Sequence, residues 1–482
     1  MPDRYHIHTA AAPALFRRTG KFASVDWRED CSRCTNCVKL RCLYDVYRRE
    51  AAFNRDPESL GETLDECKAC LSCVQGCTKG LLNVSMNPEF LAMGDEYWTP
   101  AVLFTTWNQA DTGKIPVSGA GYRGRFHGPG FDSIWTDMSE IVRPTRDGIH
   151  GREYISTSVD IGPKPLRLKF TPEGRMLTEP LRLLEIQLPA ILDIPAWPAQ
   201  GARLAAARMV AAKDLQTLAV VRAGDAVQAL PKQLPFVVPL LAKEDIANSQ
   251  DIVEGVKMAQ LRDGPDVAAL AGKLLAINPR LTLSVRLPLS PASADRIVEL
   301  NRAGLKVFHL CANQHGRERL PDGHTGRHIK DALREVHGRL VRDGLRDEIT
   351  LIVSGGIALA EHMAKAIICG ADLVAVDTAL LVALGCRVCR DAHPRDAEGE
   401  AMCGSAELCP AETDSADCAY AAKRMVNLMG AWHSQLIEVL GAMGIREVRR
   451  LRGEVGRAIF MEDIEKEAFG DLCRVPRSQV SA

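Results

Sequence analysis

The sequence predicts an α/β fold, a (β/α)8 TIM barrel that follows a small cysteine-rich domain and precedes a helical tail. Short apolar runs alternate with amphipathic stretches between residues 188 and 376, which is the pattern of repeated βα units. Eight such units in about 200 residues suit a closed barrel, and a doubly wound open sheet is the alternative. The predicted strands are Leu188–Asp193, Thr217–Val221, Pro235–Leu240, Asp251–Val256, Thr282–Leu287, Lys306–Leu310, Ile349–Ser354 and Asp372–Val376. Helical stretches between them include Ala202–Ala212, Asp266–Leu275, Ala292–Ala303 and Gly326–Asp343.

Two cysteine runs precede the barrel and predict two 4Fe–4S clusters. Their C-x2-C-x2-C spacing, followed by a fourth cysteine, is typical of two-cluster ferredoxins, because three thiolates on one short loop can hold three corners of a cube. The first run has four residues before its last cysteine rather than three, and Thr78 stands where proline is usual. A pair of zinc sites is the alternative interpretation. The predicted ligands are Cys31, Cys34, Cys37 and Cys42 in the first run, and Cys67, Cys70, Cys73 and Cys77 in the second.

The seventh and eighth predicted strands lead into a candidate flavin site. Ser354-Gly355-Gly356 follows the seventh strand, and Asp377-Thr378 follows the eighth. The glycines leave peptide N–H groups accessible to a phosphate, and barrels commonly bind phosphate after these two strands. A second cysteine group follows directly behind, so the pattern favours a flavin that exchanges electrons with iron–sulfur. The members of that group are Cys386, Cys389, Cys403 and Cys409.

Length and composition are those of a globular protein with two or three domains. The chain has 482 residues, 25% of them charged, and a formal net charge of −1, so nothing global indicates a nucleic-acid or membrane partner. No apolar run reaches the length of a membrane span, and we identify no signal peptide. Sixteen cysteines in tight spacings indicate metal ligands rather than disulfides and predict a cytoplasmic protein. Cys311, Cys369 and Cys473 stand alone and are predicted to be small buried residues.

We expect four regions along the chain. A ferredoxin-like domain at 1–95 is followed by an irregular segment at 96–180, a flavin-binding barrel with its cysteines at 181–418, and a helical extension at 419–482. Within the irregular segment, Gly119–Gly130 is either a surface loop or a second phosphate cradle. In the extension, Ala421–Leu440 is amphipathic. The arginines that follow are predicted to form a solvated helix face, and a docking surface for a partner is the alternative interpretation. These arginines are Arg446, Arg449, Arg450 and Arg452.

These motifs resemble the FMN-binding domain of glutamate synthase, especially the short archaeal type with its N-terminal pair of ferredoxin clusters. The family's SGGI run and the segments after it appear as Ser354–Ile357, Gly370–Asp372, Thr378–Leu381, Ala383–Cys386 and Cys409-Pro410. Lys257 and Gln260 match a K-x-x-Q segment beside the flavin. The resemblance implies FMN held by Ser354, Gly355, Gly356, Ile357, Asp377 and Thr378. It also implies a third cluster on Cys386, Cys403 and Cys409. This cluster is 3Fe–4S, or 4Fe–4S if Cys389 is the fourth ligand, and Cys418 could substitute for one of these cysteines.

The middle loops depart from the family pattern. The family's glycine-rich run after the sixth strand is Cys311–Gly316 here, its segment after the first strand is Ile194–Trp197, and a lysine near the fifth strand is Arg286. These loops would hold the flavin ring and the 2-oxo acid. Flavin phosphate binding therefore carries over more firmly than glutamate chemistry. We expect no N-terminal amidotransferase domain, because no cysteine nucleophile follows Met1, and that activity would then come from a separate partner subunit.

The leading hypothesis is an iron–sulfur flavoprotein oxidoreductase that acts on CH–NH2 donors. Electrons from a redox partner, a ferredoxin or an NAD(P)H-oxidising flavoprotein subunit, would reach FMN and reduce an imine or 2-oxo acid, by resemblance 2-oxoglutarate plus ammonia to glutamate. Lys257 and Gln260 would act near the flavin, Arg286 would clamp a carboxylate, and His315 would donate a proton. The alternative is an electron-transfer subunit of a larger redox complex with a different substrate.

Overall fold

The computed structural model describes most of the barrel and parts of the flanking segments. The described residues are 5–16, 18–19, 22–27, 30, 34, 40–41, 71–115, 128–136, 155–164, 169–177, 183–195, 202–320, 325–388 and 417–470. Most of the predicted loop Gly119–Gly130, up to residue 127, lies outside these ranges.

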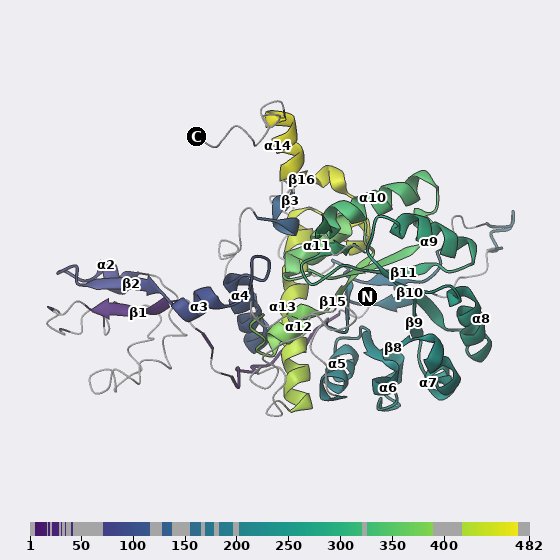
Figure 1. The fold of residues 1–482 in the computed structure, drawn as a ribbon, viewed down its shortest axis with the longest axis horizontal. Coiled ribbons are helices and arrows are strands. Elements are labelled where there is room, and N and C mark those ends of the chain that lie inside the picture. The colour runs from purple at the N-terminus through teal and green to yellow at the C-terminus, as the bar shows by residue number, and fades with distance from the viewer. Residues whose placement is uncertain are drawn as a thin grey trace.

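Eight parallel strands close into a barrel, which confirms the predicted fold class (Figure 1). Around the ring they follow the order β6-β7-β8-β9-β10-β11-β14-β15, and β15 pairs with β6 to close it. Most of their residues are buried, because both faces of a parallel barrel sheet are covered. The strands are β6 (Ala190–Leu192), β7 (Ala219–Arg222), β8 (Val237–Leu241), β9 (Met258–Arg262), β10 (Thr282–Pro288), β11 (Val307–Cys311), β14 (Thr350–Ser354) and β15 (Leu373–Val376).

Seven of the eight predicted strands are confirmed, and the fourth prediction is wrong. Residues Gln250–Gly255 form helix α7, and the fourth strand is β9, which begins at Met258. The helix buries Ile252 and Val253 only, whereas β9 is buried continuously from Met258 to Leu261. Two short apolar runs lie next to each other here, and length alone does not distinguish a buried strand from a one-turn helix.

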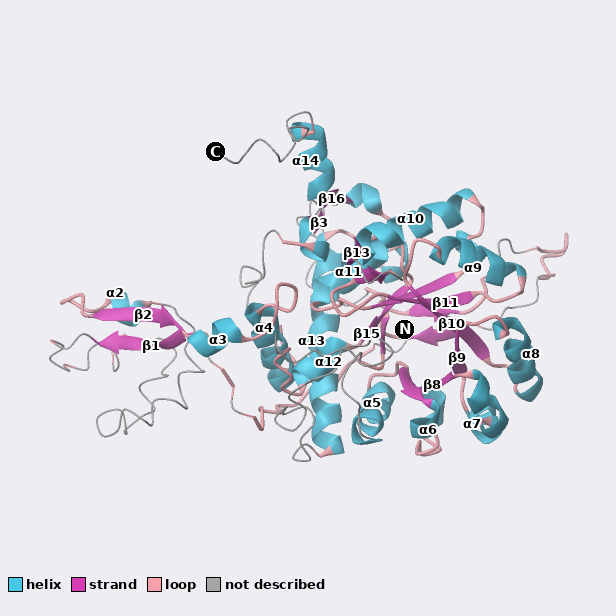
Figure 2. Cartoon of the chain, viewed as in Figure 1, coloured by secondary structure: helices cyan, strands magenta, loops and turns pink. Residues whose placement is uncertain are grey.

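Helices surround the strands, and Figure 2 shows the magenta barrel inside its cyan helical shell. The longer helices follow the predicted amphipathic stretches, because each places one apolar stripe against the sheet. They are α5 (Ala202–Asp214), α8 (Val267–Ile277), α9 (Ser293–Arg302), α10 (Ile329–Arg342) and α11 (Ala360–Ile368). Shorter helices are α6 (Ala223–Ala226) after β7 and α12 (Thr378–Ala383) after β15.

Small antiparallel sheets lie outside the barrel. A hairpin of β12 (Arg317–Arg319) and β13 (Thr325–His328) follows β11. Strand β3 (Ile134–Thr136) pairs with β16 (Ala458–Phe460), and β4 (Val159–Ile161) pairs with β5 (Leu184–Ile186). In the cysteine-rich region, β1 (Phe22–Trp27) pairs with β2 (Leu82–Met86) beside the short helix α2 (Ser72–Gln75). These last three elements lie away from the barrel, at the left of Figure 1, and α3 (Pro88–Ala92) follows them.

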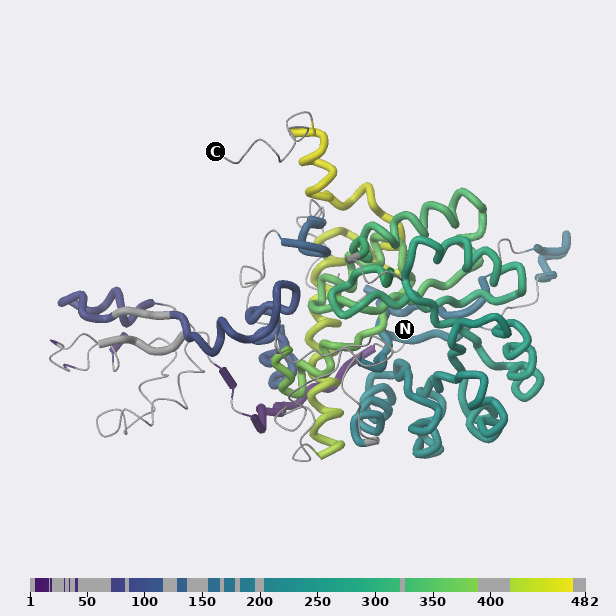
Figure 3. The backbone as a smooth tube through the Cα atoms, in the orientation of Figure 1, coloured from purple at the N-terminus to yellow at the C-terminus, as the bar shows by residue number. Residues whose placement is uncertain are grey.

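Helix α13 (Cys418–Ala442) ties the two ends of the chain to the barrel. It packs against α5, α11 and α4 (Pro100–Thr112), and its buried residues belong to the same core as the barrel. Asn427 exchanges hydrogen bonds with the backbone of Ala10, so the N-terminal segment crosses this helix (Figure 3). The predicted helical extension is therefore helical, and it is an integral part of the main core.

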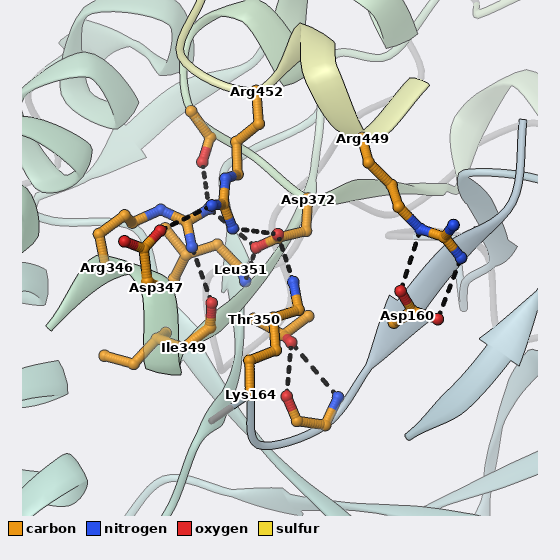
Figure 4. A network of polar contacts seen from close by, with 12 residues as sticks. Asp160, Lys164, Arg346, Asp347, Ile349, Thr350, Leu351, Asp372, Arg449 and Arg452 are labelled. Atoms are coloured by element: carbon orange, nitrogen blue, oxygen red, sulfur yellow. Dashed lines mark hydrogen bonds and ion pairs between the residues drawn. The ribbon is translucent and has the colours of Figure 1, made fainter. Parts of the chain in front are cut away.

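An ionic cluster around Asp372 joins the beginnings of β14 and β15 to the C-terminal segment (Figure 4). The Asp372 carboxylate accepts hydrogen bonds from Arg346 at 2.8 Å, Lys164 at 2.9 Å and Arg452 at 3.0 Å. Burial by itself would raise the pKa of Asp372, but these three cations together hold it well below its ordinary value.

Of the arginines after α13, Arg446, Arg449 and Arg450 are exposed, as predicted, whereas Arg452 is half-buried. Arg452 binds Asp372, and Arg449 forms ion pairs with Asp160 and Glu185. Periodicity could not reveal these partners, because they lie far away in the sequence. Across the described ranges, no helix combines the length and hydrophobicity of a membrane span.

Candidate active site at the carboxyl end of the barrel

An ion pair crosses the barrel just below its carboxyl-terminal rim. Arg286 lies in β10, and Asp193 follows β6, the strand diametrically opposite in the ring of eight. The guanidinium donates to both carboxylate oxygens, at 2.8 and 3.0 Å, which is a bidentate contact. Burial would raise the pKa of Asp193, but Arg286 outweighs it and lowers that pKa to about 2. This pair therefore forms a charged floor under any ligand at this face.

A second polar group lies against the pair in the barrel interior. Gln260 of β9 accepts a hydrogen bond from Arg286 and donates to Ser284 and to Nδ1 of His309. Because Nδ1 accepts, the neutral His309 ring carries its proton on Nε2, which lies 3.7 Å from Asp193. Burial, with Arg286, lowers the pKa of His309 to about 3, so the ring is neutral. These contacts hold Gln260 and Arg286 in one orientation.

The structure brings two of the four predicted catalytic side chains together. Gln260 and Arg286 share the interior network, but the guanidinium predicted to clamp a substrate carboxylate is already bound to Asp193. Lys257 lies immediately before β9, at the opposite end of the strand from the site, where its exposed ammonium group lies 5.9 Å from the ring centroid of Phe236. Its predicted place near the flavin came from the family resemblance, and in the structure Lys257 lies apart from Gln260 and Arg286.

The turn Ser354–Ile357 forms the predicted cradle at the end of β14. Gly355 and Gly356 have φ angles of +92° and +71°. A Cβ on Gly355 would lie 2.5 Å from the carbonyl oxygen of Asn313, so the loop after β11 also demands glycine here. All four residues are buried, and the peptide N–H groups of Gly355, Gly356 and Ile357 donate to no described residue. Buried unpaired N–H groups are rare, so the turn is suited to an anionic ligand.

Thr378 and Asp377 lie beside this cradle, because β14 and β15 are neighbours in the sheet. The Thr378 side chain is fully buried, and its hydroxyl has no hydrogen-bond partner among the described residues. The Asp377 carboxylate accepts the N–H of Thr378 at 2.6 Å. Burial, with the nearby Asp193 charge, raises the pKa of Asp377 to about 7.

His315 lies on the loop after β11, where a carboxylate from outside the barrel holds it. Its Nε2 is 2.7 Å from Oδ2 of Asp95, in the segment before α4. Burial would raise the pKa of Asp95, but the hydrogen bond and charge of His315 contribute to holding it below its ordinary value. Sequence reasoning missed Asp95, because nothing local marks a residue whose partner lies 220 positions away.

Aromatic residues of the same segment reach the cradle directly. Tyr97 donates its hydroxyl proton to the carbonyl of Gly356 at 2.5 Å, and Trp98 donates its indole N–H to the carbonyl of Gln314 at 2.9 Å. Gly94 donates to the carbonyl of Arg387, the residue after Cys386. Residues 94–98 therefore connect the cradle, the His315 loop and the start of the second cysteine group.

An open depression of about 370 Å³ lies at the ends of β7, β8 and β9. Arg222 and Arg262 face it, and neither guanidinium forms a hydrogen bond or ion pair with a described residue. Glu244 and Asp245 also line it, so it offers both signs of charge. Such a lining suits a small polar molecule that carries a carboxylate and an amino group.

Eight of the twelve predicted cluster ligands lie outside the described residues, and Cys34, Cys73, Cys77 and Cys386 lie within them. The surroundings of Cys77 show whether this residue suits an iron–sulfur cluster. Its sulfur accepts the N–H of Leu81 at 3.4 Å, and backbone N–H groups, chiefly that of Leu81, lower the pKa of its thiol. N–H donors to sulfur favour the thiolate that iron requires, so this residue fits a cluster ligand. The predicted ligands outside the described residues are Cys31, Cys37, Cys42, Cys67, Cys70, Cys389, Cys403 and Cys409.

FMN also fits the residues present. The unpaired N–H groups of Gly355–Ile357 and the unpartnered Thr378 hydroxyl supply hydrogen-bond donors suited to a phosphate. The Asp193–Arg286 floor lies one strand away from Asp377. The site thus has donors for the charged end of the cofactor and a rigid polar surface beside them.

Comparison with known proteins finds sequences that this chain resembles. Residues 246–446 match the family described as the conserved region in glutamate synthase. The chain is 25% identical over 480 residues to an archaeal-type glutamate synthase [NADPH] of Dehalococcoides mccartyi, covering 89% of this chain and 93% of that one. It is also 25% identical over 500 residues to the archaeal glutamate synthase [NADPH] of Methanocaldococcus jannaschii, covering 91% and 95%.

Among solved structures, the flavin-binding domain of baker's yeast flavocytochrome b2 has a TM-score of 0.41 and 12% identity, with 78% of this chain and 82% of that one covered. A mutant mandelate oxidase with a monooxide FMN adduct has a TM-score of 0.39 and 16% identity, with 76% and 93% covered. Both scores lie below 0.5, a likeness too distant to bear on the site.

Proposed function

Because this chain is a relative of the archaeal-type glutamate synthases over about nine tenths of its length, we propose that it is an FMN- and iron–sulfur-dependent oxidoreductase of that type. Its reaction would be reduction of an imine formed from a 2-oxo acid, with 2-oxoglutarate and ammonia as the first substrates to test. The observation that carries the proposal is the unpaired set of donors at Gly355–Ile357 and Thr378, at the two strand ends where barrels commonly bind phosphate.

The chain's own residues position and protect the reacting groups. Ser354–Ile357 and Thr378 would hold FMN, which supplies hydride transfer when bound. The Asp193–Arg286 pair and Gln260 would support the cofactor from below and keep water out of the barrel. His315, oriented by Asp95, would hold a proton at Nδ1, the nitrogen that Asp95 leaves available.

The cysteine runs would hold two 4Fe–4S clusters before the barrel and a 3Fe–4S or 4Fe–4S cluster behind it. Such clusters supply one-electron transfer when bound. The link from Gly94 to Arg387, together with Tyr97 on Gly356, supports a close approach of the second cysteine group to the cradle. A ferredoxin or an NAD(P)H-oxidising flavoprotein subunit would deliver the electrons in the cytoplasm, and a separate amidotransferase subunit could supply ammonia.

An electron-relay subunit with a different acceptor is the second candidate. One observation favours it: Arg286, the residue proposed to bind a substrate carboxylate, is committed to Asp193. In the first candidate, the substrate carboxylate must therefore bind elsewhere, and the unpaired Arg222 and Arg262 at the depression are available for it.

Anaerobic purification with quantitation of iron, acid-labile sulfide and flavin tests the cofactors. We expect about eight to twelve irons and one FMN per chain. A zinc-containing protein without iron would contradict both candidates. Iron without flavin would contradict the proposal that the cradle binds FMN, and the protein would then be a scaffold for iron–sulfur clusters.

Reoxidation of the photoreduced protein distinguishes the two candidates. Bleached flavin absorbance that returns with 2-oxoglutarate plus ammonia, and with neither alone, supports the first candidate. Return only with a protein partner supports the relay. Substituting Arg222 and Arg262 by methionine should raise the 2-oxoglutarate concentration needed for half-maximal reoxidation, and the exposed Arg450→Met variant is the control.

A further inference from the structure

Two buried carboxyl groups occupy adjacent positions at the rim of the barrel. Asp193 follows β6 and Asp377 follows β15, and these strands pair with Val376 opposite Leu192. The N–H of Asp193 donates to the carbonyl of Val376 at 2.8 Å. Their relative accessibilities are 0% and 6%, so neither carboxyl group has bulk water to stabilise a charge.

The two carboxyl groups have very different partners. The carboxylate of Asp193 accepts hydrogen bonds from both terminal nitrogens of the Arg286 guanidinium. Asp377 receives the N–H of Thr378, and none of the described cations forms an ion pair with it. Two adjacent buried carboxylates cannot both ionise at low cost, so the one without the ion pair retains its proton.

The ligand cradle adds a second reason for Asp377 to be neutral. Asp377 immediately precedes Thr378, whose buried hydroxyl lacks a partner among the described residues. Its charge also acts on Tyr97, whose hydroxyl contacts Gly356 in the cradle. An ionised Asp377 would therefore repel a phosphate held by Gly355–Ile357 and Thr378.

We propose that Asp377 takes part in this cradle as a protonated carboxyl group, so that binding of a phosphate-bearing ligand is coupled to protonation of Asp377. The inference rests on the proposed function, because FMN is the ligand assumed. The groups that act on the Asp377 carboxyl are Asp193 and Arg286 from the barrel and Tyr97 from the segment before α4.

The sign of the coupling follows from the charges. With a pKa of about 7, Asp377 loses its proton as the pH rises above neutrality. The phosphate itself is then already a dianion, because its second pKa is about 6. Between about pH 7.5 and 9.5, the apparent Kd for FMN should rise about tenfold per pH unit, since binding must restore one proton.

Isothermal titration calorimetry of the flavin-stripped full-length chain with FMN tests this coupling. Titrations at several pH values in two non-phosphate buffers of different ionisation enthalpy report both Kd and proton uptake. Riboflavin is the ligand control, because it lacks the phosphate. Asp377→Asn removes the titrating group, and Asp266→Asn, at an exposed surface pair with Lys243, is the matched control.

We expect uptake of about one proton per FMN at alkaline pH in the wild type and the Asp266→Asn variant, and a nearly flat Kd in Asp377→Asn. Riboflavin should bind without this proton uptake. A pH-independent Kd with no proton uptake in the wild type would overturn the inference while leaving FMN binding intact, and that measurement needs no variant. An unchanged slope in a folded Asp377→Asn protein would also overturn it. Absence of FMN binding at every pH would instead reject the proposed function.

Discussion

The Thr378 side chain fits a role in ligand binding better than a role in the stability of the fold. Its buried hydroxyl has no partner among the described residues, so the fold gains nothing from it in the absence of a ligand. Burying an unsatisfied hydroxyl costs about 1–3 kcal/mol, and such a group persists where something else uses it. The backbone N–H groups of Gly355–Ile357 also lack partners among the described residues. A bound anion would accept hydrogen bonds from these N–H groups and from the Thr378 hydroxyl.

The Thr378→Val variant replaces this hydroxyl by a methyl group of similar size. We expect the free energy of unfolding to stay equal or to rise by about 1 kcal/mol, while the Kd for FMN rises about tenfold. Denaturant titration and flavin fluorescence quenching measure the two effects. Thr106→Val is the control, because Thr106 is also buried with an unpartnered hydroxyl but lies in α4. Equal FMN affinity in Thr378→Val and wild type would contradict the assignment.

Gly356 is constrained by both its backbone angle and its neighbours. Its φ is +71°, and an added Cβ would lie 2.5 Å from the backbone nitrogen of Gly316. Gly356→Ala should therefore lower the free energy of unfolding by about 2 kcal/mol or more and displace the His315 loop. Thermal denaturation should show the loss. Gly264→Ala, where a Cβ meets nothing within 4 Å, should change the stability by at most about 0.5 kcal/mol, and a similar loss in both variants would refute this account.

At the scale of elements, β14 and β15 begin in an ionic cluster and end in the ligand cradle. Asp372, next to the start of β15, also accepts the N–H of Leu351 in β14 at 2.8 Å, so it aligns the two strands that carry the cradle at their other ends. A change here should act on the distant site through the register of these strands.

Asp372→Asn should cost about 3–5 kcal/mol, because Arg346 is buried and would lose its anionic partner. Since the pKa of Asp372 is depressed in the folded chain, its contribution is present above the unfolded pKa and is lost as the pH falls through the folded value. Denaturant titrations between pH 7 and acid should show a smaller loss on acidification in Asp372→Asn than in the wild type.

Asp347→Asn serves as the control for this prediction. The Asp347 side chain is 76% exposed and also pairs with Arg452, so its loss should leave stability and its pH dependence almost unchanged. Equal destabilisation by both substitutions would show that the buried position of Asp372 is not what matters.

At the scale of the whole molecule, a single core joins the barrel to segments from both ends of the chain. Arg424 of α13 is fully buried and donates to the carbonyls of Ala383 and Ala12 and to the carboxylate of Asp111. It thus connects the end of α12, the N-terminal segment and α4.

Arg424→Met should destabilise the chain by about 3 kcal/mol and release the N-terminal segment, because two buried carbonyls and one carboxylate lose a donor. Hydrogen exchange at residues 10–12 should accelerate by more than the global loss of stability explains. Arg450→Met, at an exposed position, should leave exchange unchanged. Unaltered protection of the N-terminal segment in Arg424→Met would contradict this role.

The barrel class, seven of its strands and the position of the candidate cradle could be predicted from the amino-acid sequence. These features are recorded locally, as apolar runs, helical periodicity and two glycines after a strand. The fourth strand was misread because α7 and β9 are short apolar runs on either side of Val256 and Lys257, and short runs carry no decisive period.

Which side chains meet could not be predicted from the sequence, because it follows from how the barrel closes. Barrel closure brings Asp193 and Arg286, 93 positions apart, face to face and removes Arg286 from the role of an open carboxylate clamp. It also sets Asp377 beside Asp193 and brings Asp95 to His315. Such pairs form because whole elements close and pack against one another. The residues next to each position in the sequence carry no information about a partner that lies far away in the chain.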